Sequence, residues 1–178
     1  TLSRSDDNAT TWIQLHTNPG FPANFDKITS IAVHPTNSNR VYVTIGGYRS
    51  GVKVYSSTNG GASWTNLSAG LANLPVNAAV ANDNGDLYIG TDIGVFYRTE
   101  TGTWMPFFNG LPKVPITDLE IRNGVVFAST FGRGIWSTSV RGNCPLLLNL
   151  TANQTGRIAY EAQTINASFQ LINGAGTE

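Results

Sequence analysis

The chain contains 178 residues, of which 12% are charged and 40% are hydrophobic, and its formal net charge is zero. Because 11 basic residues balance 11 acidic ones and no run of like charge occurs, we expect no nucleic-acid partner. No apolar stretch approaches the ~20 residues that a transmembrane helix needs, so none is expected. Cys144 is the only cysteine and has no metal-ligand spacing around it, so we expect no internal disulfide, no metal and no cofactor.

The first predicted element is a turn at residues 5–12, in the order Ser, x, Asp, x, small, x, Thr, Trp. Its aspartate can accept hydrogen bonds from backbone N–H groups two residues further on, as in Asx-turns. A tryptophan is large enough to cover such a turn and to fill the gap below it. We therefore assign a structural role, in preference to a catalytic or metal-binding one, to Ser5, Asp7, Thr11 and Trp12.

Three strand repeats follow, and they begin at residues 28, 76 and 116, which are 48 and 40 residues apart. Each opens with an alternating segment: Ile28–Val33, Val76–Ala81 or Ile116–Ile121. A β-branched or aromatic run, a glycine turn and a third run come next, and no segment shows a sustained helical period. This spacing is typical of the four-stranded blades of a β-propeller and predicts an all-β fold.

The turn motif recurs at residues 57–64, after the third run of the first repeat. Its glycines allow a positive φ at no steric cost, and asparagine takes the place of the acid. The residues that match the first copy or shape the turn are Ser57, Asn59, Gly61, Ser63 and Trp64. A third, partial copy ends at Trp104.

Together these copies resemble the Asp-box, or BNR repeat, of sialidase-type and sortilin-like β-propellers. In that family the motif is a folding element on the face away from the ligand. The resemblance implies that residues 1–141 form a partial propeller: the end of one blade, two full antiparallel blades and a closing three-stranded blade. The copies depart from the family pattern at Asn59, which replaces the acid, and at Ala9, which replaces a glycine.

The segment Ala128–Trp136 resembles the closing blade of bacterial sortilin-like propellers. Residues 158–176 resemble the start of the coat-hanger-stack modules of secreted Bacteroidetes proteins, so we expect 142–178 to hold a linker and the start of a C-terminal β module. The resemblance implies an exported bacterial protein, extracellular or on the cell surface, that uses the type IX route with its signal beyond Glu178. It also implies upstream blades or neighbouring chains as partners at the open blade edges.

A polar layer predicts where a ligand would bind. Thr29, Asn77 and Thr117 occupy the same slot, second in each innermost strand, and that slot lines the channel mouth of a propeller. The surrounding loops carry three further candidates: Tyr48, Phe131 and Arg133. A glycan or a peptide is the expected ligand, and simple contact of loop ends with the blades is the plainer explanation of the aromatic residues.

Catalytic residues are harder to find. An Asp-box glucanase would use two acids about 5–10 Å apart, for which the candidates are Asp92, Asp118 and Glu120. The last two point to one side of a strand, next to the expected channel wall. A sialidase would need converging arginines and a Tyr–Glu pair. Tyr97, Arg98 and Glu100 are neighbours in sequence, but they lie on the strand that enters a turn motif, away from the expected ligand face.

The sequence therefore predicts a non-catalytic fragment of a secreted or cell-surface multidomain bacterial protein. It would act as a scaffold or as a propeller that binds protein or carbohydrate. Two alternatives remain open. One is part of a propeller glycoside hydrolase, sialidase-like or xyloglucanase-like, whose acids lie partly upstream. The other is a structural filament or surface-layer subunit, in which open blade edges pair between chains.

Overall fold

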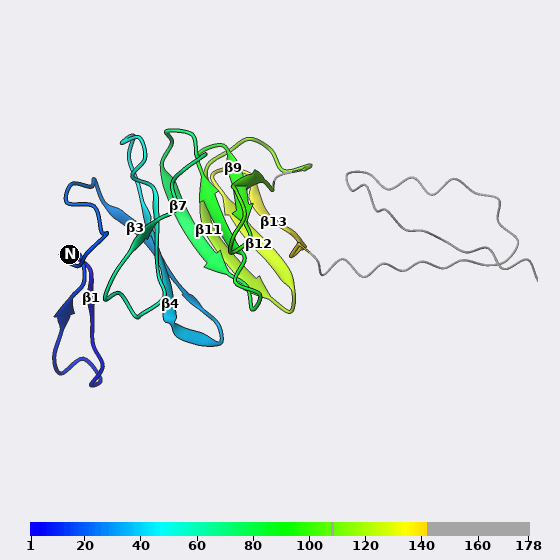
Figure 1. Ribbon diagram of the computed structural model, residues 1–178. Helices are drawn as coiled ribbons and strands as arrows, with labels where there is room; N and C mark the ends of the chain where they lie inside the picture. Colours follow the sequence, from blue (N-terminus) through cyan, green and yellow to red (C-terminus); the bar gives the residue numbers. More distant parts are fainter. Residues whose placement is uncertain (108, 142–178) are drawn as a thin grey trace, which may run out of the picture. The chain divides into compact units, whose positions relative to one another are not determined.

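The structure is a computed structural model, and it describes residues 1–107 and 109–141 (Figure 1). All regular secondary structure in this part of the chain is β-strand, and every strand pair is antiparallel. Within it, no helix could cross a membrane. The C-terminal module expected at 142–178 lies outside the described residues, so that prediction and its boundary stay predictions.

The described strands form a two-stranded hairpin and three larger sheets, which we call the first, second and third blades. The hairpin consists of β1 (Ser3–Arg4) and β2 (Ile13–Gln14). The first blade consists of β3 (Ile28–His34), β4 (Asn37–Ile45), β5 (Val54–Ser57) and β6 (Thr65–Asn66). The second consists of β7 (Val76–Ala81), β8 (Leu87–Thr91), β9 (Gly94–Arg98) and β10 (Met105–Pro106). The third consists of β11 (Ile116–Arg122), β12 (Val125–Thr130) and β13 (Gly134–Ser139).

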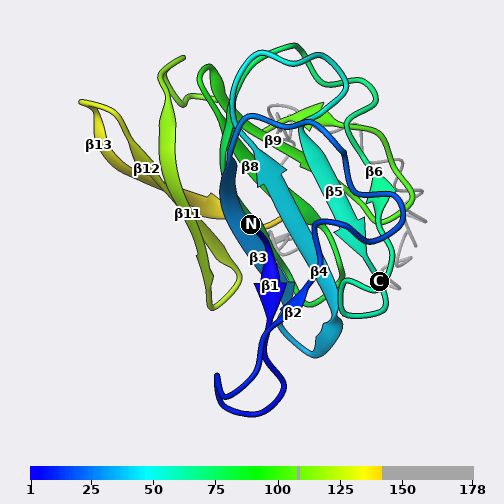
Figure 2. The same ribbon diagram turned by 90° about the vertical axis from the view of Figure 1, so that its left-hand side faces the viewer.

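Strands within each blade follow one another in chain order, and the blades stack face to face (Figure 1). The innermost strands β3, β7 and β11 come into contact, so the three blades share a common inner side (Figure 2). The prediction of an all-β fold with four-stranded antiparallel propeller blades in a partial ring is therefore confirmed.

The second blade is buried on both faces because its strands carry apolar residues at successive positions. In β8, Leu87 and Ile89 face the first blade, whereas Tyr88 between them faces the third, as the alternation of a strand requires. Gly90 lets the third blade approach closely, because a Cβ built there would lie 2.5 Å from Cγ2 of Ile116. These two apolar layers hold the stack together.

The N-terminal hairpin lies against the face of the first blade that is turned away from the second blade. Leu15 follows β2 and shares a buried cluster with Phe21 and Trp64, whose rings are 5.3 Å apart. Gly61 has a φ of 92°, and a Cβ there would meet Leu15 at 2.6 Å. The turn at residues 57–64 thus needs glycine at this position both for its backbone and for the contact with the hairpin.

Candidate functional site

The two turn motifs close outer hairpins by nearly the same hydrogen bonds. In the first, the Ser5 hydroxyl donates to the Asp7 carboxylate over 2.9 Å and accepts from the N–H of Ala9 over 2.8 Å. The N–H and hydroxyl of Thr11 donate to the same carboxylate over 2.8 and 2.6 Å. These bonds, that of the Thr11 hydroxyl foremost, lower the pKa of Asp7 from 3.8 to about 2.

Asn59 takes the place of Asp7 in the second motif. Its Oδ1 accepts from the Ser57 hydroxyl over 2.8 Å and from the N–H of Ser63 over 2.9 Å. Its amide nitrogen donates to the Ser63 hydroxyl over 2.9 Å, so this last bond runs in the opposite direction to that between Thr11 and Asp7. A hydroxyl can donate or accept, and either side chain can therefore close the turn.

Three of the predicted residues meet at the opposite end of the blades, where the β4–β5 and β8–β9 loops lie; we call this cluster of Tyr48, Asn77 and Asp92 the mouth cluster. The amide of Asn77 donates to Asp92 Oδ1 over 2.9 Å, and the hydroxyl of Tyr48 donates to Oδ2 over 3.4 Å. Tyr48 is 65% exposed, so its ring remains available on the surface. The cluster joins the first blade to the second.

The other predicted ligand residues are not part of the mouth cluster. Thr29 contacts the hydroxyl of Thr44 at 2.9 Å and donates to the carbonyl of Val76 over 2.5 Å, which ties β3 to the start of β7. On the third blade, the Thr117 hydroxyl donates to the carbonyl of Ser129 over 3.2 Å. Phe131 and Arg133 lie in the exposed turn between β12 and β13. Within residues 1–107 and 109–141, no hydrogen bond connects these third-blade residues to the mouth cluster.

The carboxylates considered for catalysis are spread over two elements. Asp92 belongs to the mouth cluster, whereas Asp118 and Glu120 lie on β11 opposite Ser129 and Phe127. Since Leu119 between them is buried against the second blade, both acids are on the face of β11 turned away from that blade. Glu120 is paired with Arg122 at 2.7 Å. Among the described residues, no group of three or more His, Cys, Asp and Glu side chains could hold a metal ion.

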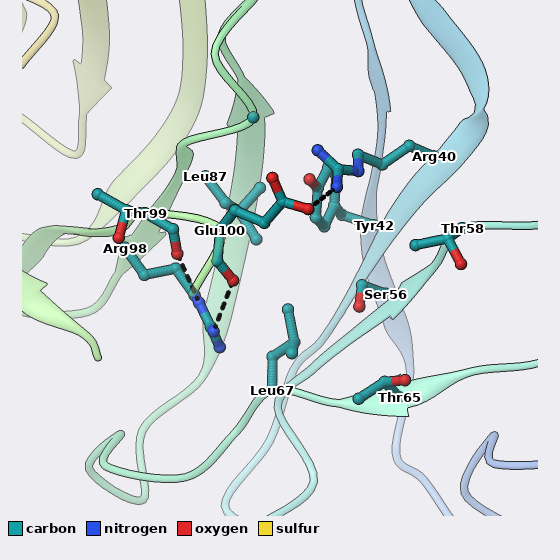
Figure 3. Close-up of a pocket in the computed structure, with 11 residues that line it drawn as sticks. Arg40, Tyr42, Ser56, Thr58, Thr65, Leu67, Leu87, Arg98, Thr99 and Glu100 are labelled. Carbon is teal, nitrogen blue, oxygen red and sulfur yellow. Dashed lines mark hydrogen bonds and ion pairs between the residues drawn. The ribbon is translucent and has the colours of Figure 1, made fainter. Parts of the chain in front are cut away.

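The structure also contains a pocket of about 200 Å³ between the first and second blades, at their turn-motif end (Figure 3). The first blade contributes Arg40, Tyr42, Ser56, Thr58, Thr65 and Leu67. The second blade contributes Gly85, Leu87, Arg98, Thr99 and Glu100. We call it the inter-blade pocket. The sequence shows Arg98 and Glu100 as neighbours but does not place Arg40 or Tyr42 beside them, because no local pattern shows which strands of two blades face each other.

An ion pair crosses the inter-blade pocket from Glu100 to Arg40. The guanidinium of Arg98 points elsewhere in the pocket, toward the side where Leu67 lies (Figure 3). It donates to the carbonyls of Thr99 and Glu100, both over 3.3 Å. Burial lowers the pKa of Arg98 and raises the pKa of Tyr42, whose phenol therefore stays neutral as a hydrogen-bond donor.

Comparison with known proteins identifies the class of fold. No protein-family model and no curated protein sequence matches the chain. Among solved structures, a GH74 xyloglucanase from Xanthomonas campestris matches with a TM-score of 0.60 and 16% identity, over 79% of this chain and 26% of that protein. A GH74 enzyme from Niastella koreensis matches with a TM-score of 0.57 and 18% identity, over 76% and 24% of the two chains.

The extracellular domain of a one-component system from B. thetaiotaomicron matches with a TM-score of 0.55 and 15% identity, over 76% of this chain and 18% of that one. At such identities the likeness shows the fold alone, and it is that of a β-propeller. The chain spans about a quarter or less of the length of each of these proteins.

Proposed function

We propose that the chain is a non-catalytic part of an exported bacterial β-propeller, and that it binds a glycan at the mouth cluster. The observation that carries this proposal is the position of the Asp92 carboxylate, which accepts hydrogen bonds from Asn77 and from the hydroxyl of Tyr48. The ring of Tyr48 is itself largely exposed beside this carboxylate. Sugar rings present C–H faces that stack on aromatic rings and hydroxyl edges that bond to carboxylates and amides. An apolar surface with a few well-placed polar groups is the usual makeup of a ligand site.

The similar structures support the class of ligand and the location. One of them is a xyloglucanase and another is an extracellular domain, so we propose a β-glucan such as xyloglucan as the ligand and export as the fate of this chain. The two turn motifs support a sortilin-like Asp-box propeller as the finer family. Type IX export and attachment to the cell surface rest on the sequence resemblance alone.

The experiment is calorimetric titration of the 178-residue chain with xyloglucan oligosaccharides. Tyr48→Ala should abolish the heat of binding because the stacking ring is lost, whereas Tyr48→Phe keeps the ring and should retain most of the affinity. Trp12→Ala is the matched control, because Trp12 is similarly exposed, at 62%, but belongs to the first turn motif. Absence of binding to any β-glucan, or equal loss in the Trp12 variant, would contradict the proposal.

A second candidate function is favoured by the likeness to two GH74 enzymes: part of a glycoside hydrolase whose acid pair is completed outside the described residues. Asp92 would then be the acid contributed by this part, since it lies at the mouth end and not on a blade face. Release of reducing sugar from xyloglucan, lost in Asp92→Asn and kept in Asp118→Asn, would favour this alternative over simple binding.

A further inference from the structure

The inter-blade pocket contains one cation without a matching anion. Arg40 is neutralised by Glu100 across the pocket. In the part of the chain that the structure describes, no carboxylate comes within ion-pair distance of Arg98, which meets carbonyl oxygens at 3.3 Å and lies 5.7 Å above the centre of the Trp104 ring. The pocket therefore has a formal charge of about one positive unit on the side of Leu67 (Figure 3).

Arg98 is half-buried, and this partial burial makes its guanidinium a favourable site for an anion. Removing a guanidinium from water costs free energy, which is the reason that the pKa of Arg98 is lowered. A carboxylate that enters the pocket would offset that cost and accept two parallel hydrogen bonds from the planar guanidinium of Arg98. The backbone carbonyls of Thr99 and Glu100 now occupy only two of the five N–H donors of Arg98, and over long distances.

The remaining walls indicate what the carboxylate is attached to. Hydroxyls of Ser56, Thr58 and Thr65 lie along the first blade, and Leu67 and Leu87 provide apolar surface beside them (Figure 3). Hydroxyl groups and apolar patches together suit a sugar ring, which has both hydroxyl edges and C–H faces. The volume of about 200 Å³ is below the ~300–1,000 Å³ of drug-sized sites, so it would hold one ring and not a chain.

We propose that the inter-blade pocket binds a hexuronic acid residue, with the sugar carboxylate paired to the guanidinium of Arg98. The pocket is at the turn-motif end of the blades, whereas the mouth cluster is at the other end, so this second site would act independently of the proposed glycan site. A propeller with both sites could contact a neutral β-glucan and an acidic polysaccharide at the same time.

The test is an NMR titration of amide resonances of the full 178-residue chain with glucuronate, with glucose and acetate as comparison ligands. We expect saturable shifts at Arg98, Thr99 and Leu67 with glucuronate, and weaker binding of the other two. Arg98→Gln should weaken glucuronate binding by about tenfold or more, the equivalent of one charge-assisted hydrogen bond. Arg122→Gln, on the third blade, is the control and should leave binding unchanged.

A second variant separates binding from folding. Glu100→Gln removes the carboxylate that would compete with glucuronate for Arg40, but it leaves the backbone carbonyl that Arg98 contacts. Glucuronate should therefore bind more tightly to this variant. No saturable shift with glucuronate, unchanged binding in Arg98→Gln, or weaker binding in Glu100→Gln would each overturn the proposal. Equal binding of acetate and glucuronate would overturn the assignment to a sugar acid.

Discussion

The indole nitrogen of Trp104 donates a 2.6 Å hydrogen bond to the backbone carbonyl of Leu67 and so joins the second blade to the first. Leu67 follows β6, the outermost strand of the first blade, and Trp104 precedes β10, the outermost strand of the second. The same ring lies beneath the guanidinium of Arg98. One side chain thus links the outer strands of two blades and contacts two residues that line the inter-blade pocket, Leu67 and Arg98.

Trp104→Phe should therefore destabilise the chain. The partly buried carbonyl of Leu67 loses its donor, and the cation–π contact of Arg98 weakens, so we expect a loss of about 1–2 kcal/mol in the free energy of unfolding. Urea denaturation measures it. Trp12→Phe makes the same chemical change at an exposed site and should cost almost nothing. Equal effects of the two variants would show that the bond to Leu67 contributes no stability.

Asp7 should titrate at about pH 2, because hydrogen bonds from Thr11 and Ser5 stabilise its carboxylate in the folded state. The folded pKa lies below the usual value of 3.8, so the contribution of Asp7 to stability is present above that pH and is lost as the pH falls toward 2. Carboxyl carbon NMR measures the pKa. Thr11→Val should move it up toward 3.8, and Thr11→Ser, which keeps the hydroxyl, should not.

Asn59→Asp should preserve folding, because the Ser63 hydroxyl can turn from acceptor to donor and reproduce the bonds seen at Asp7. The melting temperature and glycan binding should stay close to those of the original chain. Trp64→Ala is the contrasting change: Trp64 is buried against Phe21, and its truncation should cost ~3–5 kcal/mol. Loss of binding in Asn59→Asp with unchanged stability would instead point to a ligand role for Asn59.

The strand repeats and turn motifs could be predicted from the sequence because each is a local pattern. Alternation of apolar residues identifies a strand, and the Ser-x-Asp order with a following tryptophan identifies the turn. The mouth cluster shows where such reasoning stops: Tyr48 and Asp92 are 44 residues apart and meet only because two blades stack. Arg40 and Glu100, 60 residues apart in the inter-blade pocket, meet for the same reason.

The direction in which each face of a strand points was only partly predictable from the sequence. Alternation places Asp118 and Glu120 on one side of β11, as expected from the sequence. Which side that is depends on Leu119, which is buried against the second blade and turns both acids away from it. Alternation shows which residues share a face and that the apolar face is the buried one, but it does not show which neighbouring blade that face meets.

The described stack ends in two blade faces that carry exposed apolar side chains: that of the third blade, and that part of the first-blade face which the N-terminal hairpin leaves open. On the first blade, Ile31 and Val33 are half exposed, on the side of β3 opposite to Ala32, which faces the second blade. On the third blade, Phe127 and Ile135 lie opposite to the face that meets the second blade, and Ile135 is 72% exposed. Among the described strands, β13 pairs with β12 alone, so its outer edge is open as well.

The last prediction concerns these open faces. Exposed apolar faces and an unpaired strand edge favour association, so the 178-residue chain should self-associate as its concentration rises, whereas a longer protein that supplies further blades should not. Sedimentation velocity measures the mass.

Ile135→Lys places a charge on the open face beside the edge and should shift the chain toward monomer. Trp12→Lys adds the same charge at an exposed aromatic residue of the first turn motif and should leave the association unchanged. Equal responses to both substitutions would show that the third-blade face is not an interface. A chain that stays monomeric at every concentration would show that neither open face is one, and the expectation of neighbouring blades or chains would lose its physical support.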